Sequence, residues 1–263
     1  MKKNFSDTGY TIIRNAINKD LFKNIQQEIY KTLNIKGKSQ NEKYSKFCKQ
    51  VKNLRINEYD YAKPIFENLH YKKFLDKLFL EKKIYKTVSD LLGKDLAFCT
   101  DTGITLNLPN KASSKKNYLF KDWHQEIWSG ASPSTVQIWL PLIHKNSKSG
   151  QMQIIEESHK WGHVPHMNRK PSLLPKKYKT KNLNLEYGDA IIFSTLLMHR
   201  TLPTLSPRLS LPILLKNYKN KDNSFQFNRN FKIYSNSELT KIERILGNHY
   251  LTPFRLKNLN EDN

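Results

Sequence analysis

The chain has 263 residues, a formal net charge of +22, and 38% hydrophobic and 11% aromatic residues. Its 13 Phe, 13 Tyr and 4 Trp exceed what a disordered chain carries, so the composition predicts a folded protein with a sizeable core. The chain has only two cysteines, Cys48 and Cys99, which are too few for a disulfide framework. No apolar run approaches the length of a membrane span. We therefore expect a protein of the reducing cytoplasm.

The positive charge favours anionic partners, because a basic surface attracts anions over a long range. The lysines are scattered among asparagines and isoleucines, as a biased composition also produces. No compact basic block is interleaved with aromatic residues, so a nucleic acid is the less favoured partner.

Residues 1–93 are predicted to be mainly helical. A short strand at Tyr10–Ile13 precedes an amphipathic helix over residues 18–33, with Asn18 as its N-cap. The polar stretch 34–46 is expected to be a loop or a flap. Helical periodicity then dominates residues 51–92, and Gly93 is a typical helix end.

After Gly93 the pattern changes to short β-type runs separated by turn residues. Pro212 falls inside the last run and predicts an edge or bent strand. Residues 217–231 are expected to form a loop, and a capping box from Ser235 to Glu238 starts a final helix that Gly247 ends. The strands are expected at Leu96–Cys99, 104–108, Val136–Ile143, Met152–Ile155, 190–197 and 209–215.

Helices followed by many short strands indicate the α+β class. We expect a β sandwich or barrel buttressed by N-terminal and C-terminal helices. No repeat or long linker marks a second domain, so residues 1–263 are predicted to form one domain. It comprises a helical part (about 1–93), a β core (about 94–216) and a C-terminal loop and helix (about 217–263).

The sequence Asp-Trp-His-Gln-Glu at residues 122–126 carries the chemistry. An extended backbone sends His124 and Glu126 to the same side, and His199 ends an apolar run that is typical of a buried strand. Two histidines and one carboxylate with open coordination positions are typical of non-haem Fe(II) oxygenases. The alternatives are a surface His-Glu pair without metal and a core histidine.

Arg208 follows a turn nine residues after His199. Its planar guanidinium matches a carboxylate bidentately, so it is a candidate to bind an acidic co-substrate. A salt bridge in the turn is the alternative, and Arg200 is a rival expected to face away. Asp101 and Asp122 are rival carboxylates for the metal.

His159, His163 and His166 form a second histidine cluster that resembles a zinc site in its composition. Gly162 and Pro165 place it on a loop, where this spacing imposes no fixed geometry. A pocket-lining or packing role for His159 is the favoured interpretation.

Together these motifs make the chain resemble the phytanoyl-CoA dioxygenase-like family of Fe(II)/2-oxoglutarate-dependent oxygenases. The resemblance begins with FSDTGYTIIRNAI and a helix, and continues through WHQE and IWLPLIHKNSKSGQMQIIEESHKWGH. It closes with GDAIIFSTLLMHRTLPTLSPRLSL. The order and spacing of WHQE, SGQMQIIEESHK and the closing segment are its most specific part.

The resemblance implies a double-stranded β-helix core of the jelly-roll or cupin type. It implies that His124, Glu126 and His199 bind Fe(II), and that Arg208, with Thr201 as a hydroxyl partner, binds the distal carboxylate of 2-oxoglutarate. It places Gln125 and Trp139 in the co-substrate pocket. The chain departs from the family by having Glu126 where aspartate is usual, and Glu156 and Glu157 where the family prefers Pro-Gly.

The predicted activity is that of a dioxygenase which hydroxylates a small or carrier-tethered metabolite, with dioxygen consumed and succinate and CO2 released. Lysines in the expected pocket walls, residues 34–46, 109–121, 165–181 and 224–231, favour an anionic substrate. The alternatives are a catalytically silent β-helix protein that binds an anionic partner, and an oxygenase acting on nucleic acid or protein.

Overall fold

The computed structural model describes residues 2–52, 54, 58–101, 103–108, 122–143, 151–168, 170–202, 206–220 and 230–246. Its N-terminal part is helical, with one strand, β1 (Tyr10–Ile13), between the first two helices. The helices of this part are α1 (Lys2–Thr8), α2 (Lys19–Thr32), α3 (Gln40–Lys52), α4 (Glu58–Tyr71), α5 (Phe74–Leu80) and α6 (Lys82–Leu92).

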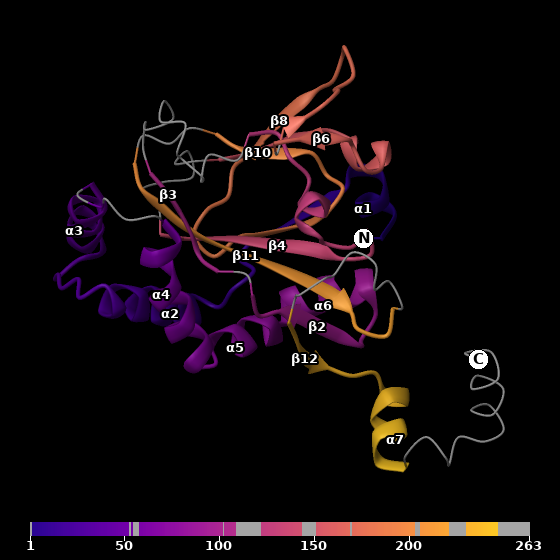
Figure 1. Ribbon diagram of the computed structural model, residues 1–263. Coiled ribbons are helices and arrows are strands. Elements are labelled where there is room, and N and C mark those ends of the chain that lie inside the picture. The colour runs from indigo at the N-terminus through magenta and orange to yellow at the C-terminus, as the bar shows by residue number, and fades with distance from the viewer. Residues whose placement is uncertain are drawn as a thin grey trace, which may run out of the picture.

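Seven strands form a large antiparallel sheet in the order β1-β9-β4-β11-β2-β12, with β3 also paired to β11. Helices α2, α4 and α5 lie on one side of this sheet, as Figure 1 shows. The strands that follow β1 in it are β2 (Leu96–Cys99), β3 (Thr105–Asn107), β4 (Val136–Ile143), β9 (Ala190–Ser194), β11 (Arg208–Asn217) and β12 (Phe231–Ser235).

A second antiparallel sheet, in the order β10-β5-β8, lies on the side of the large sheet away from those helices (Figure 1). Its strands are β5 (Met152–Ile155), β8 (Thr180–Leu183) and β10 (His199–Thr201). The remaining elements are the 3-10 helices η1 (Glu126–Ser129) and η2 (Ser158–Trp161), the hairpin of β6 (His166–Met167) and β7 (Lys170–Pro171), and α7 (Glu238–Leu246).

Strand β4 explains why the core lies on both faces of the large sheet. All eight residues of β4 are buried, and successive side chains point to opposite faces. Ile138 and Leu140 pack in the cluster that contains the helices, whereas Trp139 packs with Met152 and Ile154 of the small sheet. The helices and the small sheet therefore cover the two faces of one central layer.

The mixed helical and antiparallel architecture agrees with the expected α+β class. Strand β1 and helix α2 lie where they were predicted. The Asn18 side chain caps α2 by accepting hydrogen bonds from the N–H groups of Asp20 (2.8 Å) and Leu21 (3.4 Å). The winding of a double-stranded β-helix and the single-domain assignment stay predictions. None of the described helices is long and apolar enough to cross a membrane.

Two expected boundaries are wrong. The polar stretch 34–46, expected to be a loop or a flap, is helical from Gln40 onward. Helix α3 begins there because Tyr44, Phe47 and Val51 give it an apolar side among many polar residues. The apolar run 190–197 is not one strand, since β9 ends at Ser194. The chain turns there, and His199 begins β10 instead of ending β9.

The strand around Pro212 was expected to be an edge strand or bent. The edge position is wrong, because β11 lies inside the large sheet, although its pairing with β4 shifts register between Leu209 and Ser210. Pro212 nevertheless occupies a tolerant position. Strand β4 pairs with β11 along residues 209–215, but on the other side the ladders with β3 and β2 reach only residues 208–210 and 215–217. Residues 211–214 thus have one described ladder neighbour, and a proline fits there as it does at an edge.

Most of the expected loop over residues 217–231 lies outside the described residues, but the cap of the last helix differs from the expected one. Residues 231–235 form β12, an edge strand paired with β2. The N–H of Thr240 donates to Ser237 Oγ (3.3 Å), so Ser237, and not Ser235, caps α7. Ser235 Oγ instead donates to the carbonyl of Lys94 (2.6 Å). Gly247 lies outside the described residues.

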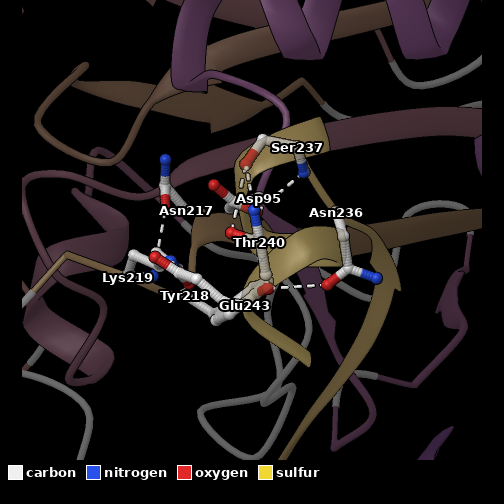
Figure 2. A network of polar contacts seen from close by, with 8 residues as sticks. All are labelled: Asp95, Asn217, Tyr218, Lys219, Asn236, Ser237, Thr240 and Glu243. Carbon is white, nitrogen blue, oxygen red and sulfur yellow. Dashed lines mark hydrogen bonds and ion pairs between the residues drawn. The ribbon is translucent and has the colours of Figure 1, made fainter. Parts of the chain in front are cut away.

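A polar network attaches α7 to the sheet (Figure 2). Asp95, just before β2, accepts a hydrogen bond from the N–H of Ser237 (2.8 Å). Tyr218 donates to Asn236 Oδ1 (2.7 Å), and Lys219 forms an ion pair with Glu243 of α7 (2.5 Å). Fixed polar contacts therefore hold α7 against the end of β11.

Candidate metal centre

The backbones of His124 and His199 form an isolated antiparallel bridge. Each residue donates its N–H to the carbonyl of the other at 3.0 Å. The two imidazole rings lie with their centroids 4.1 Å apart. Two histidines that are distant in sequence are thus joined by main-chain bonds, and their side chains share one location.

Hydrogen bonds of the two rings fix their tautomers. His124 Nδ1 lies 2.7 Å from the carbonyl oxygen of Asp122, and His199 Nδ1 lies 2.9 Å from that of Leu197. A carbonyl oxygen only accepts, so Nδ1 carries the proton in each ring. In the neutral imidazoles Nε2 then presents its lone pair, which is the arrangement that a metal ligand requires.

Glu126 completes the group. Gln125 has an extended backbone (φ −114°, ψ 144°), so Glu126 points to the same side as His124 although it begins η1. Glu126 Oε1 lies 3.4 Å from His124 Nε2 and 3.3 Å from His199 Nε2. All three residues are buried, with 8%, 6% and 4% exposure for His124, Glu126 and His199.

The ligand atoms of His124, Glu126 and His199 lie within 4.8 Å of one another. In the described part of the chain, no other set of three histidine, cysteine or acidic side chains converges in this way. Two neutral imidazoles and one carboxylate suit a divalent transition metal and leave coordination positions open. The donor set therefore fits the iron that the sequence predicted.

Gln137 of β4 is a further polar residue at this centre, and the sequence interpretation missed it. Its side chain is buried, and Nε2 donates to Glu126 Oε1 at 3.1 Å. One signal was present in the sequence, because Gln137 is the only amide side chain within the apolar run of β4.

Arg208 lies at the start of β11 and is 2% exposed. Its Nη2 donates to Asn107 Oδ1 at 2.5 Å, and its guanidinium lies 4.8 Å from the centroid of the Trp139 ring. Trp139 and Arg208 are thus neighbours, as a shared pocket requires. Asn107, opposite Arg208 in the β3–β11 ladder, was also missed, because a single asparagine near a turn has no distinctive pattern.

Thr201 and Gln125 differ in their relation to the centre. Thr201 is half-buried in β10, two residues after His199, and so shares its side of the strand. Gln125 donates to the carbonyls of Gly162 (2.8 Å) and Leu196 (2.6 Å) and accepts from the N–H of Val164 (2.9 Å). Its amide thus joins two loops. The place of Gln125 in the co-substrate pocket stays a prediction.

The rival residues are engaged elsewhere. Arg200 stacks on Trp123 at 4.4 Å, and its Nε donates to Gln153 Oε1 at 2.7 Å. Asp122 accepts from the N–H of Trp123 (2.8 Å) and lies 3.6 Å from Arg200. Asp101 accepts from the N–H of Asn230 at 2.6 Å. These contacts place the three charged groups in structural roles outside the group of ligands.

The second histidine cluster does not converge. His159 lies against Gly9, and its Nε2 is 2.8 Å from the carbonyl oxygen of Ser6. His166 stacks on the Trp128 ring with a centroid distance of 4.4 Å, and the rings of His163 and His166 are 6.1 Å apart. The packing interpretation of His159 is therefore favoured over the zinc site.

A cavity of about 670 Å³ lies between α2, the start of α3 and the turn at Tyr187, on the helical side of the large sheet. Phe22, Tyr30, Tyr44 and Tyr187 contribute aromatic walls. Stretch 34–46 thus lines a cavity, but on the face of the sheet opposite to Gln137 and Trp139. The expected wall at residues 109–121 and most of that at 224–231 lie outside the described residues.

Comparison with known proteins shows the family and the fold of this chain. A family model described as phytanoyl-CoA dioxygenase (PhyH) matches residues 5–210. The apo structure of the non-haem monooxygenase ThoJ has a TM-score of 0.58 at 14% identity, covering 90% of this chain and 84% of that chain.

Two further structures share the fold. The epimerase SnoN, in complex with Fe³⁺, alpha-ketoglutarate and nogalamycin RO, has a TM-score of 0.51 at 10% identity, with 82% of each chain covered. EvdO2 from Micromonospora carbonacea var. aurantiaca, complexed with 2-oxoglutarate, has a TM-score of 0.50 at 16% identity, covering 81% of this chain and 88% of that chain. At these identities the likeness shows a common fold.

Proposed function

Because the chain belongs to the phytanoyl-CoA dioxygenase family, we propose that it is an Fe(II)- and 2-oxoglutarate-dependent dioxygenase. Its substrate is a small or carrier-tethered anionic metabolite, and the reaction is a hydroxylation. The observation that carries the proposal is the convergence of His124, Glu126 and His199 on one buried point.

Nε2 of His124, Nε2 of His199 and the carboxylate of Glu126 would hold Fe(II). The backbone bridge between the histidines and the bonds from each Nδ1–H to a carbonyl orient the two lone pairs before the metal arrives. A bound Fe(II) would supply the activation of dioxygen for the oxidative decarboxylation of 2-oxoglutarate, with one oxygen atom going to succinate, the other to the hydroxylated product, and CO2 released.

Arg208 binds the distal carboxylate of 2-oxoglutarate. Its burial supports this role, because a charge-assisted hydrogen bond is stronger where water is excluded. Asn107 holds Nη2, and the Trp139 ring lies beside the guanidinium, so the side chain is oriented before the co-substrate enters. Thr201 contributes a hydroxyl from β10.

The proposal includes one dioxygenase domain over residues 1–263 with a double-stranded β-helix core. Two antiparallel sheets and the family match support that architecture. A cytoplasmic location agrees with Cys48 and Cys99, both of which are free thiols. The net charge of +22 supports the anionic substrate.

The reaction type needs a direct assay, because structures with this fold include a monooxygenase, an epimerase and a carbocyclase. The purified protein is incubated with Fe(II), 2-oxoglutarate, oxygen and a panel of anionic metabolites, and the products are analysed by mass spectrometry. We expect equal amounts of succinate and of a product that has gained one oxygen atom. A product that has lost two hydrogen atoms would contradict hydroxylation and indicate ring closure or desaturation. A product of unchanged mass would indicate epimerisation.

A further inference from the structure

Gln137 is a polar side chain in a position that apolar residues otherwise fill. It is 4% exposed, and its neighbours in the adjacent strands are Phe193 of β9 and Leu214 of β11. An amide in such surroundings is costly unless it forms a hydrogen bond. Its bond to Glu126 is therefore the feature that explains its presence.

The direction of this bond follows from the partner. A carboxylate only accepts, so the NH2 side of the Gln137 amide faces Glu126. Glu126 Oε1 thus receives an N–H at 3.1 Å, and the same oxygen lies 3.4 Å and 3.3 Å from the two imidazole Nε2 atoms. Gln137 contacts the atom on which the whole group converges.

Glu126 needs such support more than an aspartate would. The additional methylene moves the carboxylate about 1.5 Å further from the backbone and adds one torsion that must be ordered. Glu126 also begins the short helix η1, where the backbone passes from the extended conformation of Gln125 to a 3-10 helix. A donor on the rigid central strand β4 fixes the far end of this longer side chain.

We propose that Gln137 is a positioning residue which enables a glutamate to serve as the carboxylate ligand in this chain. The length of Glu126 and the position of the Gln137 amide form a matched pair. This inference rests on the proposed metal site, and it concerns a residue that contacts the ligand and not the metal. It predicts that changes at the two positions are not additive.

The test uses Co(II) as a spectroscopic probe for the metal, with the full chain and without turnover. The dissociation constant is measured by titration, and the visible bands report the coordination of the ion. Gln137→Met keeps the side-chain length and removes the donor. Gln26→Met is the matched control, because Gln26 is also buried and donates its Nε2 to the carbonyl of Leu142 on the same strand (2.9 Å).

We expect Gln137→Met to weaken Co(II) binding by about 10- to 100-fold and to alter the bands, as the loss of a bond to a metal ligand does. Gln26→Met should leave both unchanged. Glu126→Asp withdraws the carboxylate from Gln137, so it should weaken binding less in the Gln137→Met background than in the wild type. If Gln137→Met does not fold, Gln137→Asn, which is one methylene shorter, provides the same comparison.

Two results would overturn the inference in distinguishable ways. In the first, the wild type binds Co(II), but Gln137→Met binds it with the same affinity and the same bands, or the effects of the two substitutions are additive. That result would reject the role of Gln137 and leave the metal site intact. Failure of the folded wild type to bind Co(II) would reject the metal site and the positioning role together.

Discussion

His124 and His199 exchange their backbone N–H and carbonyl groups in two 3.0 Å hydrogen bonds, while their rings lie 4.1 Å apart. The bridge joins a segment before η1 to the first residue of β10. The main chain therefore determines how close the two imidazoles lie, before any metal contributes. Side chains held in this way form a preorganised site, and substitutions in it should affect binding more than folding.

Arg208 and Arg200 allow a matched comparison of two arginines. Arg208→Ala should raise the concentration of 2-oxoglutarate needed for half-saturation by roughly 10- to 100-fold, because a hydrogen bond to a charged group contributes about 1.5–3 kcal/mol. Arg200→Ala should change it little, since Arg200 stacks on Trp123. Binding is measured by calorimetry with a redox-inert metal. Equal effects of both substitutions would contradict the assignment of Arg208.

Gly9 and Gly103 allow a comparison of two glycines. At Gly9 φ is +78°, and an added Cβ would lie 2.5 Å from His159 Nδ1. Gly9→Ala should destabilise the protein by about 1–3 kcal/mol, because a left-handed backbone and a close contact both oppose it. At Gly103 no atom of the described residues, apart from the immediate chain neighbours, lies within 4 Å of the added Cβ, so Gly103→Ala should have little effect. Denaturant titration measures both, and a Gly9→Ala protein as stable as the wild type would refute the expectation.

Asp95 should make the attachment of α7 depend on pH. Burial raises the pKa of this carboxyl, but hydrogen bonds from Ser237 and Thr240 outweigh it and hold the pKa below its usual value (Figure 2). A carboxyl whose pKa is lower in the folded than in the unfolded protein stabilises the fold at pH values above its unfolded-state pKa of about 3.9. That stabilisation is lost as the pH falls through the folded-state pKa. Amide exchange in α7 should therefore increase below about pH 4. Asp95→Asn should exchange faster at neutral pH and lose this pH dependence.

The cap of α7 distinguishes two nearby serines. Ser237→Ala should destabilise α7 by about 1 kcal/mol, because Ser237 Oγ accepts from the N–H of Thr240. Ser235→Ala removes a bond to Lys94 and should leave the helix end unchanged. Amide exchange of Thr240 reports the difference. Faster exchange in Ser235→Ala but not in Ser237→Ala would contradict this assignment and favour the capping box from Ser235 to Glu238.

Much of the site was predictable because its signals are local. An extended His-x-Glu fixes the side on which two ligands point, and the spacing from His199 to Arg208 spans one turn. The contacts of Gln137, Asn107 and Gln125 depend on which strands lie side by side. Sequence periodicity does not carry that information, so the partners of Glu126, Arg208 and Gln125 were missed.

The errors in the fold have similar causes. Polar residues outnumber apolar ones in α3, so its periodicity was weak. Strand β12 has only partly buried or exposed residues, and its partner β2 is distant in sequence. Pro212 indicates a missing ladder neighbour correctly, but the gap lies between β3 and β2 within the sheet and not at its edge.

The most direct test of the proposed metal site is anaerobic addition of Fe(II) and then 2-oxoglutarate to the purified protein, followed by visible spectroscopy. We predict the weak charge-transfer band of a chelated keto acid in the wild type. The band should be absent in His199→Ala and should require far more 2-oxoglutarate in Arg208→Ala. A folded wild-type protein that gives no band, or a band that persists in His199→Ala, would contradict the assignment of His124, Glu126 and His199 as the iron ligands.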